Sequence, residues 1–190
     1  MSVDTVHSVL DNKIDAHISR LQTNALDNYF ALEARRKKIF ILGAGGVTPS
    51  IIYALEEMEP SKIMLSNRTK EKAENLKKSF PQLELVDWGD TKNFDMIVNT
   101  TSLGLKKDDK IPINYDQIGL GKFFYDVIYN PKKTNFLLEA EKRGHQIENG
   151  KMMFAYQAQE AFRLWTIDHN VSTGLVPPIN KKVLQILEND

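Results

Sequence analysis

A short apolar run that leads into a cluster of glycines constrains the fold of this chain more than any other stretch. Residues 39–42 are all apolar, which is typical of a buried parallel strand, and residues 51–55 beyond the glycines have helical spacing. The turn between these two segments contains, in order, Gly43, Ala44, Gly45, Gly46 and Val47. Strand, glycine turn and helix in this order are typical of the phosphate-binding corner of a dinucleotide fold.

Each part of this corner has a physical role. Gly43 permits a tight turn, and Gly45 allows the backbone to approach a pyrophosphate without an intervening Cβ. The helix would direct its free N–H groups at that phosphate, and Pro49 suits its first turn because no N–H is needed there. Thr48 replaces the third glycine of the G-x-G-x-x-G pattern, so a structural turn that binds no nucleotide is the alternative.

The next strand ends where a dinucleotide fold places the residue that contacts the adenosine ribose. Residues 63–65 are apolar and are followed by Asn67, Arg68 and Thr69, about 20 residues after the glycines. An acidic residue there would bind a ribose 2′-hydroxyl, whereas the guanidinium of Arg68 pairs with a 2′-phosphate in bidentate fashion. This position therefore predicts NADP rather than NAD, and a solvated surface arginine is the alternative.

Strand and helix patterns alternate along the rest of the chain. Further strands are predicted over residues 62–65, 83–86, 94–99, 123–127 and 145–147, and helices over 50–58, 70–80, 135–143, 151–165 and 181–188. Thr134 is expected to cap the third of these helices and Gly144 to end it. Alternation of this kind predicts an α/β fold with a Rossmann-type doubly wound parallel sheet. The loop at residues 100–104 would then lie at the carboxyl edge, where such sheets bind ligands.

Composition gives no support to several classes of function. Lys plus Arg and Asp plus Glu both number 25, so no net field favours nucleic acid or a membrane surface. The chain of 190 residues has no cysteine, and this suits a reducing compartment. No apolar run is long enough to span a membrane, and the N-terminus lacks a signal pattern. A cytoplasmic protein is the expectation.

Several motifs in register resemble those of one enzyme family. They are Gly43-Ala44-Gly45-Gly46, Ser66-Asn67-Arg68-Thr69, Asn99-Thr100-Thr101-Ser102-Leu103-Gly104, the block from Tyr125 to Thr134 and the block from Gln157 to Trp165. In this order they resemble the shikimate dehydrogenases, over about residues 38–190. The resemblance implies NADPH-dependent reduction of 3-dehydroshikimate to shikimate, a step of the chorismate pathway of aromatic amino-acid biosynthesis. It also implies an N-terminal substrate domain and a C-terminal NADP-binding domain.

The resemblance assigns roles to individual residues. The turn from Gly43 to Val47 would hold the pyrophosphate, and Asn67, Arg68, Thr69 and Lys72 would surround the 2′-phosphate. Val127 and Gly150 would border the nicotinamide, and Tyr129 and Gln157 would reach the substrate. The structural alternatives are that Tyr129 packs its ring in the turn at Pro131 and that Gln157 is a solvated helix residue.

The sequence departs from the family at its N-terminal end. The family's catalytic lysine lies in a region of the substrate domain that this chain does not contain, so no catalytic residue is assigned. Residues 1–37 resemble a remnant of that domain with its connecting helix, and residues 38–190 form the NADP-binding domain. In this register Asn24 stands at the position of the catalytic aspartate and His7 at that of a substrate-binding asparagine, with Asp27 as a competing candidate. An asparagine cannot accept a proton as a carboxylate does.

Three hypotheses follow. The first, which the order of the motifs favours, is a shikimate dehydrogenase-like oxidoreductase that is incomplete by itself. The alternatives are a non-catalytic NADP-binding module and a dehydrogenase of quinate or a related ring acid. A missing substrate domain would leave apolar side chains exposed, and these are expected to include Tyr29, Phe30, Met153 and Phe154. Such a surface predicts a homodimer or a partner domain.

Overall fold

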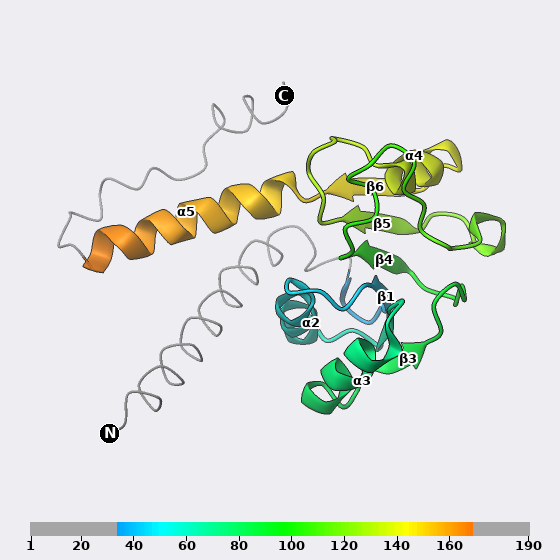
Figure 1. Cartoon of the computed structure of the whole chain (residues 1–190), viewed down its shortest axis with the longest axis horizontal. Coiled ribbons are helices and arrows are strands. Elements are labelled where there is room, and N and C mark those ends of the chain that lie inside the picture. The colour runs from blue at the N-terminus through cyan, green and yellow to red at the C-terminus, as the bar shows by residue number, and fades with distance from the viewer. Residues whose placement is uncertain (1–33, 169–190) are drawn as a thin grey trace.

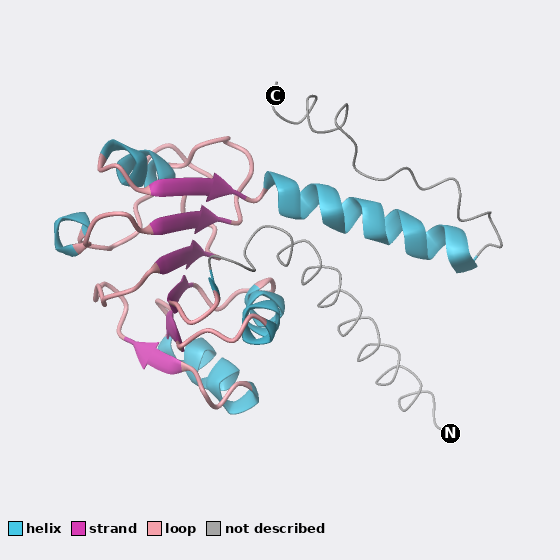
Figure 2. Cartoon of the chain, turned by 180° about the vertical axis from the view of Figure 1, so that it is seen from behind, coloured by secondary structure: helices cyan, strands magenta, loops and turns pink. Residues whose placement is uncertain are grey.

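The computed structural model describes residues 34–168, including side chains as far as residue 159. Its centre is a sheet of six strands in the order β3-β2-β1-β4-β5-β6, and every neighbouring pair is parallel (Figures 1 and 2). The strands are β1 Lys38–Leu42, β2 Lys62–Ser66, β3 Glu84–Val86, β4 Met96–Asn99, β5 Phe123–Asp126 and β6 Gln146–Asn149. This order is that of a doubly wound dinucleotide-binding sheet, so the predicted fold class is confirmed.

The helices lie close to their predicted positions. They are α2 Thr48–Glu57, α3 Lys70–Ser79, α4 Asn135–Lys142 and α5 Lys151–Asp168, with a short 3-10 helix at Tyr115–Gln117. Pro49 occupies the first turn of α2, as expected. The Thr134 hydroxyl accepts a hydrogen bond from the Leu137 N–H and so caps α4. The helix predicted at residues 181–188 lies outside the described residues, as do His7, Asn24 and Asp27.

Alternate side chains of β1 point to opposite faces of the sheet and contribute to two separate hydrophobic clusters. Ile39 and Ile41 belong to the cluster that includes α2 and α3, and Phe40 and Leu42 belong to the cluster that includes α4. All four are buried, which explains the continuous apolar run in the sequence. Figure 1 shows α2 and α3 beside the half that contains β1 to β3, and α4 beside β5 and β6. The sheet is thus covered on both faces, and only its edges and loops are left for ligands.

Strand β4 begins at Met96, later than the predicted start at residue 94. The Asp95 carboxylate accepts the Lys38 N–H at 2.9 Å. The N–H of the first residue of β1 therefore bonds to a side chain and not to a backbone carbonyl of the neighbouring strand. That hydrogen bond is the main reason why the pKa of Asp95 lies below its usual range.

Helix α5 starts at the end of β6 and runs away from the sheet (Figures 1 and 2). Asn149 supports its first turn, since its side-chain oxygen accepts the Lys151 N–H at 3.0 Å. Phe154 is 47% exposed, as expected, but Met153 is buried. The expectation that Met153 would be exposed was wrong because its side chain packs into the core cluster of α2 and α3. Tyr29 and Phe30 lie outside the described residues. Within residues 34–168, no helix is long and apolar enough to cross a bilayer.

Candidate cofactor-binding site

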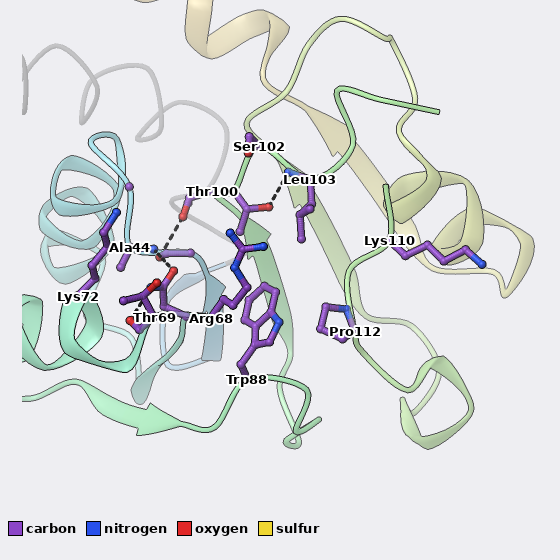
Figure 3. Close-up of a pocket in the computed structure, with 14 residues that line it drawn as sticks. Ala44, Arg68, Thr69, Lys72, Trp88, Thr100, Ser102, Leu103, Lys110 and Pro112 are labelled. Carbon is purple, nitrogen blue, oxygen red and sulfur yellow. Dashed lines mark hydrogen bonds between the residues drawn. The ribbon is translucent and has the colours of Figure 1, made fainter. Parts of the chain in front are cut away.

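The loops that follow β1, β2, β3 and β4 meet at the carboxyl edge of the sheet and enclose a cavity of about 610 Å³ (Figure 3). The strand order of the sheet reverses between β1 and β4, and a doubly wound fold binds its ligand at that point. Seven predicted site residues line this cavity: Gly43, Ala44, Gly45, Asn67, Arg68, Thr69 and Lys72. Residues from the glycine turn and from the end of β2 therefore converge, although the sequence separates them.

Gly43 is the glycine on which the turn depends. Its φ is +110°, and a Cβ there would lie 2.8 Å from both the Thr100 Oγ1 and the Thr101 Cγ2 atoms. An L side chain is therefore excluded by conformation and by space. Gly45 would place a Cβ in ordinary contact, and Gly46 would place one in open space. Both positions are exposed, and the absence of side chains there leaves the backbone of the turn accessible.

Thr48 explains why the third glycine of the motif is dispensable here. Its fully buried hydroxyl accepts the Gly45 N–H at 3.1 Å and lies 2.9 Å from the Thr100 hydroxyl. Thr100 in turn donates to the Leu42 carbonyl at 2.9 Å. The two hydroxyls thus join the turn after β1 to the end of β4, and a glycine at position 48 would remove this bridge.

Two backbone N–H groups of the turn are left for a ligand. In the part of the chain that the structure describes, no acceptor binds the N–H groups of Gly46 and Val47. These groups precede α2, so the positive end of the helix dipole adds to their field. By contrast, the Ala44 N–H donates to the Asn67 side-chain oxygen at 3.0 Å. Asn67 therefore fixes the glycine turn against the loop after β2.

The cavity wall is positively charged. Arg68 and Lys72 line it from the end of β2 and the start of α3, Lys110 lines it from the β4–β5 connection, and no acidic residue of the described chain lines it. Within residues 34–168 none of these three cations has a carboxylate partner. Unpaired cations beside open N–H groups suit a ligand with more than one phosphate.

A buried polar network holds the loop after β4. Asn99 and Asp126 are register partners on β4 and β5, and the Asn99 amide donates to the Asp126 carboxylate at 3.0 Å. The Asn99 oxygen accepts the Thr101 hydroxyl at 2.7 Å, and the amide also donates to the Leu103 carbonyl. Asp126 accepts the Thr134 hydroxyl at 2.6 Å as well. Burial nevertheless dominates and raises the pKa of Asp126 to about 6.

The remaining predicted residues do not line this cavity. Gly46 and Val47 belong to its glycine turn, whereas Val127, Tyr129, Gly150 and Gln157 lie around the start of α5. A Cβ on Gly150 would lie 2.1 Å from the Val127 carbonyl oxygen, so Val127 and Gly150 are in close backbone approach. The Tyr129 ring stacks on Phe154 with a centroid distance of 4.8 Å. Gln157 lies half-buried on α5.

Comparison with known proteins identifies the family. The chain matches the family described as shikimate / quinate 5-dehydrogenase over residues 25–103. It is 48% identical to the shikimate dehydrogenase (NADP(+)) of Pelagibacter ubique (strain HTCC1062) over 188 residues, which are 98% of this chain and 68% of that protein. The chain belongs to the shikimate dehydrogenase family.

Solved structures of shikimate dehydrogenases share its fold. That of Aquifex aeolicus gives a TM-score of 0.72 at 34% identity, covering 92% of this chain and 61% of that chain. The structure from Thermus thermophilus, in complex with NADP(H) and shikimate, gives a TM-score of 0.69 at 28% identity. It covers 85% of this chain and 58% of that chain. The chain thus spans about three fifths of the length of these two shikimate dehydrogenases.

Several cavity residues of this shikimate dehydrogenase family member were not predicted as site residues. They are Trp88, Thr100, Thr101, Ser102, Leu103, Lys110 and Pro112. Thr100 to Leu103 follow β4 directly, so their place at the carboxyl edge was predictable even though no role was assigned. Trp88 follows β3 in the same way, and this signal was present in the sequence. Lys110 and Pro112 lie in an irregular connection, which has no comparable signal in the sequence.

Proposed function

We propose that this chain binds NADP(H) at the carboxyl edge of its sheet and serves the interconversion of 3-dehydroshikimate and shikimate. The observation that carries the proposal is the meeting of the glycine turn with Arg68 and Lys72 around a cavity that no acidic residue of the described chain lines. An acidic residue at position 68 would bind a ribose hydroxyl, whereas a guanidinium suits a 2′-phosphate. Relatives named shikimate dehydrogenase (NADP(+)) support the same cofactor and reaction.

The residues present fit such a cofactor. The open N–H groups of Gly46 and Val47 would bind the pyrophosphate, and Arg68 with Lys72 would bind the 2′-phosphate. Asn67 would position the glycine turn, and Thr69 would border the 2′-phosphate pocket. When bound, the nicotinamide supplies or accepts a hydride.

We assign the other end of the site to the start of α5. Val127 and Gly150 would border the nicotinamide, as the family motifs imply, and the close approach of their backbones keeps the two residues together at the start of α5. Tyr129 and Gln157 would contact the substrate from the same region. The described residues include no assigned acid–base group, so proton transfer is proposed to depend on residues outside this part of the chain.

The proposed organisation places a substrate-domain segment at residues 1–37 and the NADP-binding domain at residues 38–190. The exposed pair of Tyr129 and Phe154 supports a partner domain or a second copy of the chain at the start of α5. The cytoplasm is the proposed compartment, since a cysteine-free chain suits a reducing environment.

The test combines binding and turnover in one folded preparation. Calorimetric titration should give a lower Kd for NADPH than for NADH, and NADP⁺ reduction is then followed by the absorbance of the reduced nicotinamide with and without shikimate. Shikimate-dependent reduction would establish that the chain contains a complete site. Faster reduction with quinate would instead identify quinate as the preferred substrate. Binding without reduction would instead identify a non-catalytic NADP-binding module. A folded chain that binds neither nucleotide would contradict the proposal.

A further inference from the structure

We infer that Trp88 is the stacking surface for the adenine base of the bound dinucleotide. This inference rests on the proposed function and adds a residue to it. Trp88 follows β3 at the edge of the sheet and lines the same cavity as the glycine turn and Arg68. It is the sole aromatic residue among those that line this cavity within the described part of the chain.

The position of Trp88 is fixed from two sides. The Ser66 hydroxyl donates to the Asp87 carbonyl at 3.2 Å, which ties the residue before Trp88 to the end of β2. On its other side the Asn114 N–H donates to the Thr91 hydroxyl at 2.8 Å, which ties the segment after Trp88 to the β4–β5 connection. The backbone that carries the indole is therefore held next to the loop of Asn67 and Arg68.

The Trp88 indole is partly packed in the hydrophobic core and partly exposed. Trp88 packs against the hydrophobic cluster that includes Phe40 and Phe94, yet it is only half-buried and its remaining surface faces the cavity. In Figure 3 the Trp88 indole and the Arg68 guanidinium rise from neighbouring strand ends into the same space. A rigid, partly anchored aromatic side chain provides stacking area at little cost in conformational entropy.

The geometry of the cofactor specifies what would cover this surface. The adenine is attached to the same ribose as the 2′-phosphate, which is assigned to Arg68 and Lys72. The base must therefore lie close to these two residues, separated from them by no more than the ribose. A purine has a flat π-face, and stacking of any base on an aromatic side chain strengthens binding by roughly tenfold or more. The indole beside Arg68 is thus in position to meet the adenine face.

Substitution separates stacking from the alternative that Trp88 only orients Arg68. Because NADPH and NADH share the adenine, Trp88→Ala should weaken both by on the order of tenfold or more and preserve their ratio. Trp88→Phe should retain most of the affinity for both. Arg68→Ala should instead change the ratio. Unchanged affinities in folded Trp88→Ala, or a change of ratio like that of Arg68→Ala, would overturn the inference.

Fluorescence gives a second readout that does not depend on turnover. The sequence has two tryptophans, Trp88 and Trp165, so a Trp165→Phe variant reports on Trp88 alone. Adenosine 2′,5′-bisphosphate should quench its emission, and nicotinamide mononucleotide, which lacks adenine, should not. Equal responses to both ligands would overturn the inference. A folded wild-type chain that binds neither NADPH nor NADH would overturn the proposed function and this inference together.

Discussion

At the scale of single residues, we expect the cofactor preference to depend on Arg68. Its side chain is exposed, lines the cavity and has no carboxylate partner within residues 34–168. Its charge is therefore available to a ligand. The neighbouring Asn67 is already engaged with the glycine turn through the Ala44 N–H. These two adjacent residues thus have different roles, because one shapes the turn and the other presents a cation.

Replacement of Arg68 by alanine should weaken NADPH binding roughly ten- to hundredfold, since a hydrogen bond to a charged group contributes about 1.5–3 kcal/mol. NADH has no 2′-phosphate, so its affinity should change by less than about threefold. Isothermal titration of both nucleotides measures this. Arg35→Ala, which removes an arginine paired with Glu59 on the exposed surface, is the matched control and should affect neither. Equal losses for the two nucleotides would refute the ribose assignment.

Gly43 and Gly46 belong to the same turn but should tolerate alanine very differently. Gly43→Ala forces a side chain into a left-handed conformation and against Thr100 and Thr101, so it should lower the free energy of unfolding by at least about 2 kcal/mol. Gly46→Ala places its Cβ in open space and should change stability by less than about 1 kcal/mol. Urea denaturation of both variants measures the difference. Similar unfolding midpoints would show that the turn relaxes around the new side chain.

At the scale of elements, the sheet and its helices were predictable because alternation and burial leave a direct pattern in the sequence. Residues 39–42 are buried on both faces, and the sequence accordingly shows a continuous apolar run. The pairing of Asn99 with Asp126 was not predictable, because it depends on the register of two strands that are distant in sequence. The burial of Met153 depends on where α5 meets the core, and spacing along the helix did not reveal it.

The Asp126 carboxylate should give the stability of the domain a specific pH dependence. Its folded-state pKa of about 6 exceeds the ordinary value of 3.8, so between these values the folded state binds more protons than the unfolded state. Unfolding free energy from this group is therefore highest below about pH 4 and falls as pH rises to about 6. A shift of about two units corresponds to roughly 3 kcal/mol at most.

Asp126→Asn removes this titration while it keeps the side-chain shape. The decline in unfolding free energy between about pH 4 and pH 6 should become shallower than in the wild type. Chemical denaturation at several pH values measures the slope. Asp108→Asn, at an exposed position in the β4–β5 connection, should leave the slope unchanged. An identical slope in Asp126→Asn would show that burial does not raise the pKa of this carboxyl.

At the scale of the whole molecule, the described part of the chain has the proposed cofactor cavity and the exposed aromatic pair on different elements. The cavity lies over the ends of β1 to β4, whereas Tyr129 and Phe154 stack at the start of α5. Both rings are exposed, at 41% and 47%. Stacked rings of this exposure form an apolar surface, and we expect a partner domain or a second copy of the chain to cover it.

Removal of this surface should reduce self-association of the chain. Phe154→Asp places a charge in the aromatic pair, so sedimentation velocity should show less dimer than in the wild type at the same concentration. Leu120→Asp is the control, because Leu120 is an apolar side chain that is 88% exposed but lies in the β4–β5 connection and not in the aromatic pair, and it should leave the distribution unchanged. A wild-type chain that sediments as a monomer would contradict the prediction.

The strand order also has a consequence for the time course of folding. Strand β1 pairs with β2, which follows soon after it, but also with β4, which is synthesised only after β3 is complete. Pairings between distant strands form slowly because loop closure costs entropy. A nascent chain that ends at β3 contains one half of the sheet but still lacks Thr100, whose hydroxyl bridges to Thr48 beside the glycine turn. We therefore expect nucleotide binding to arise only after β4 has joined the sheet, and a bound nucleotide would then stabilise the assembled sheet by mass action.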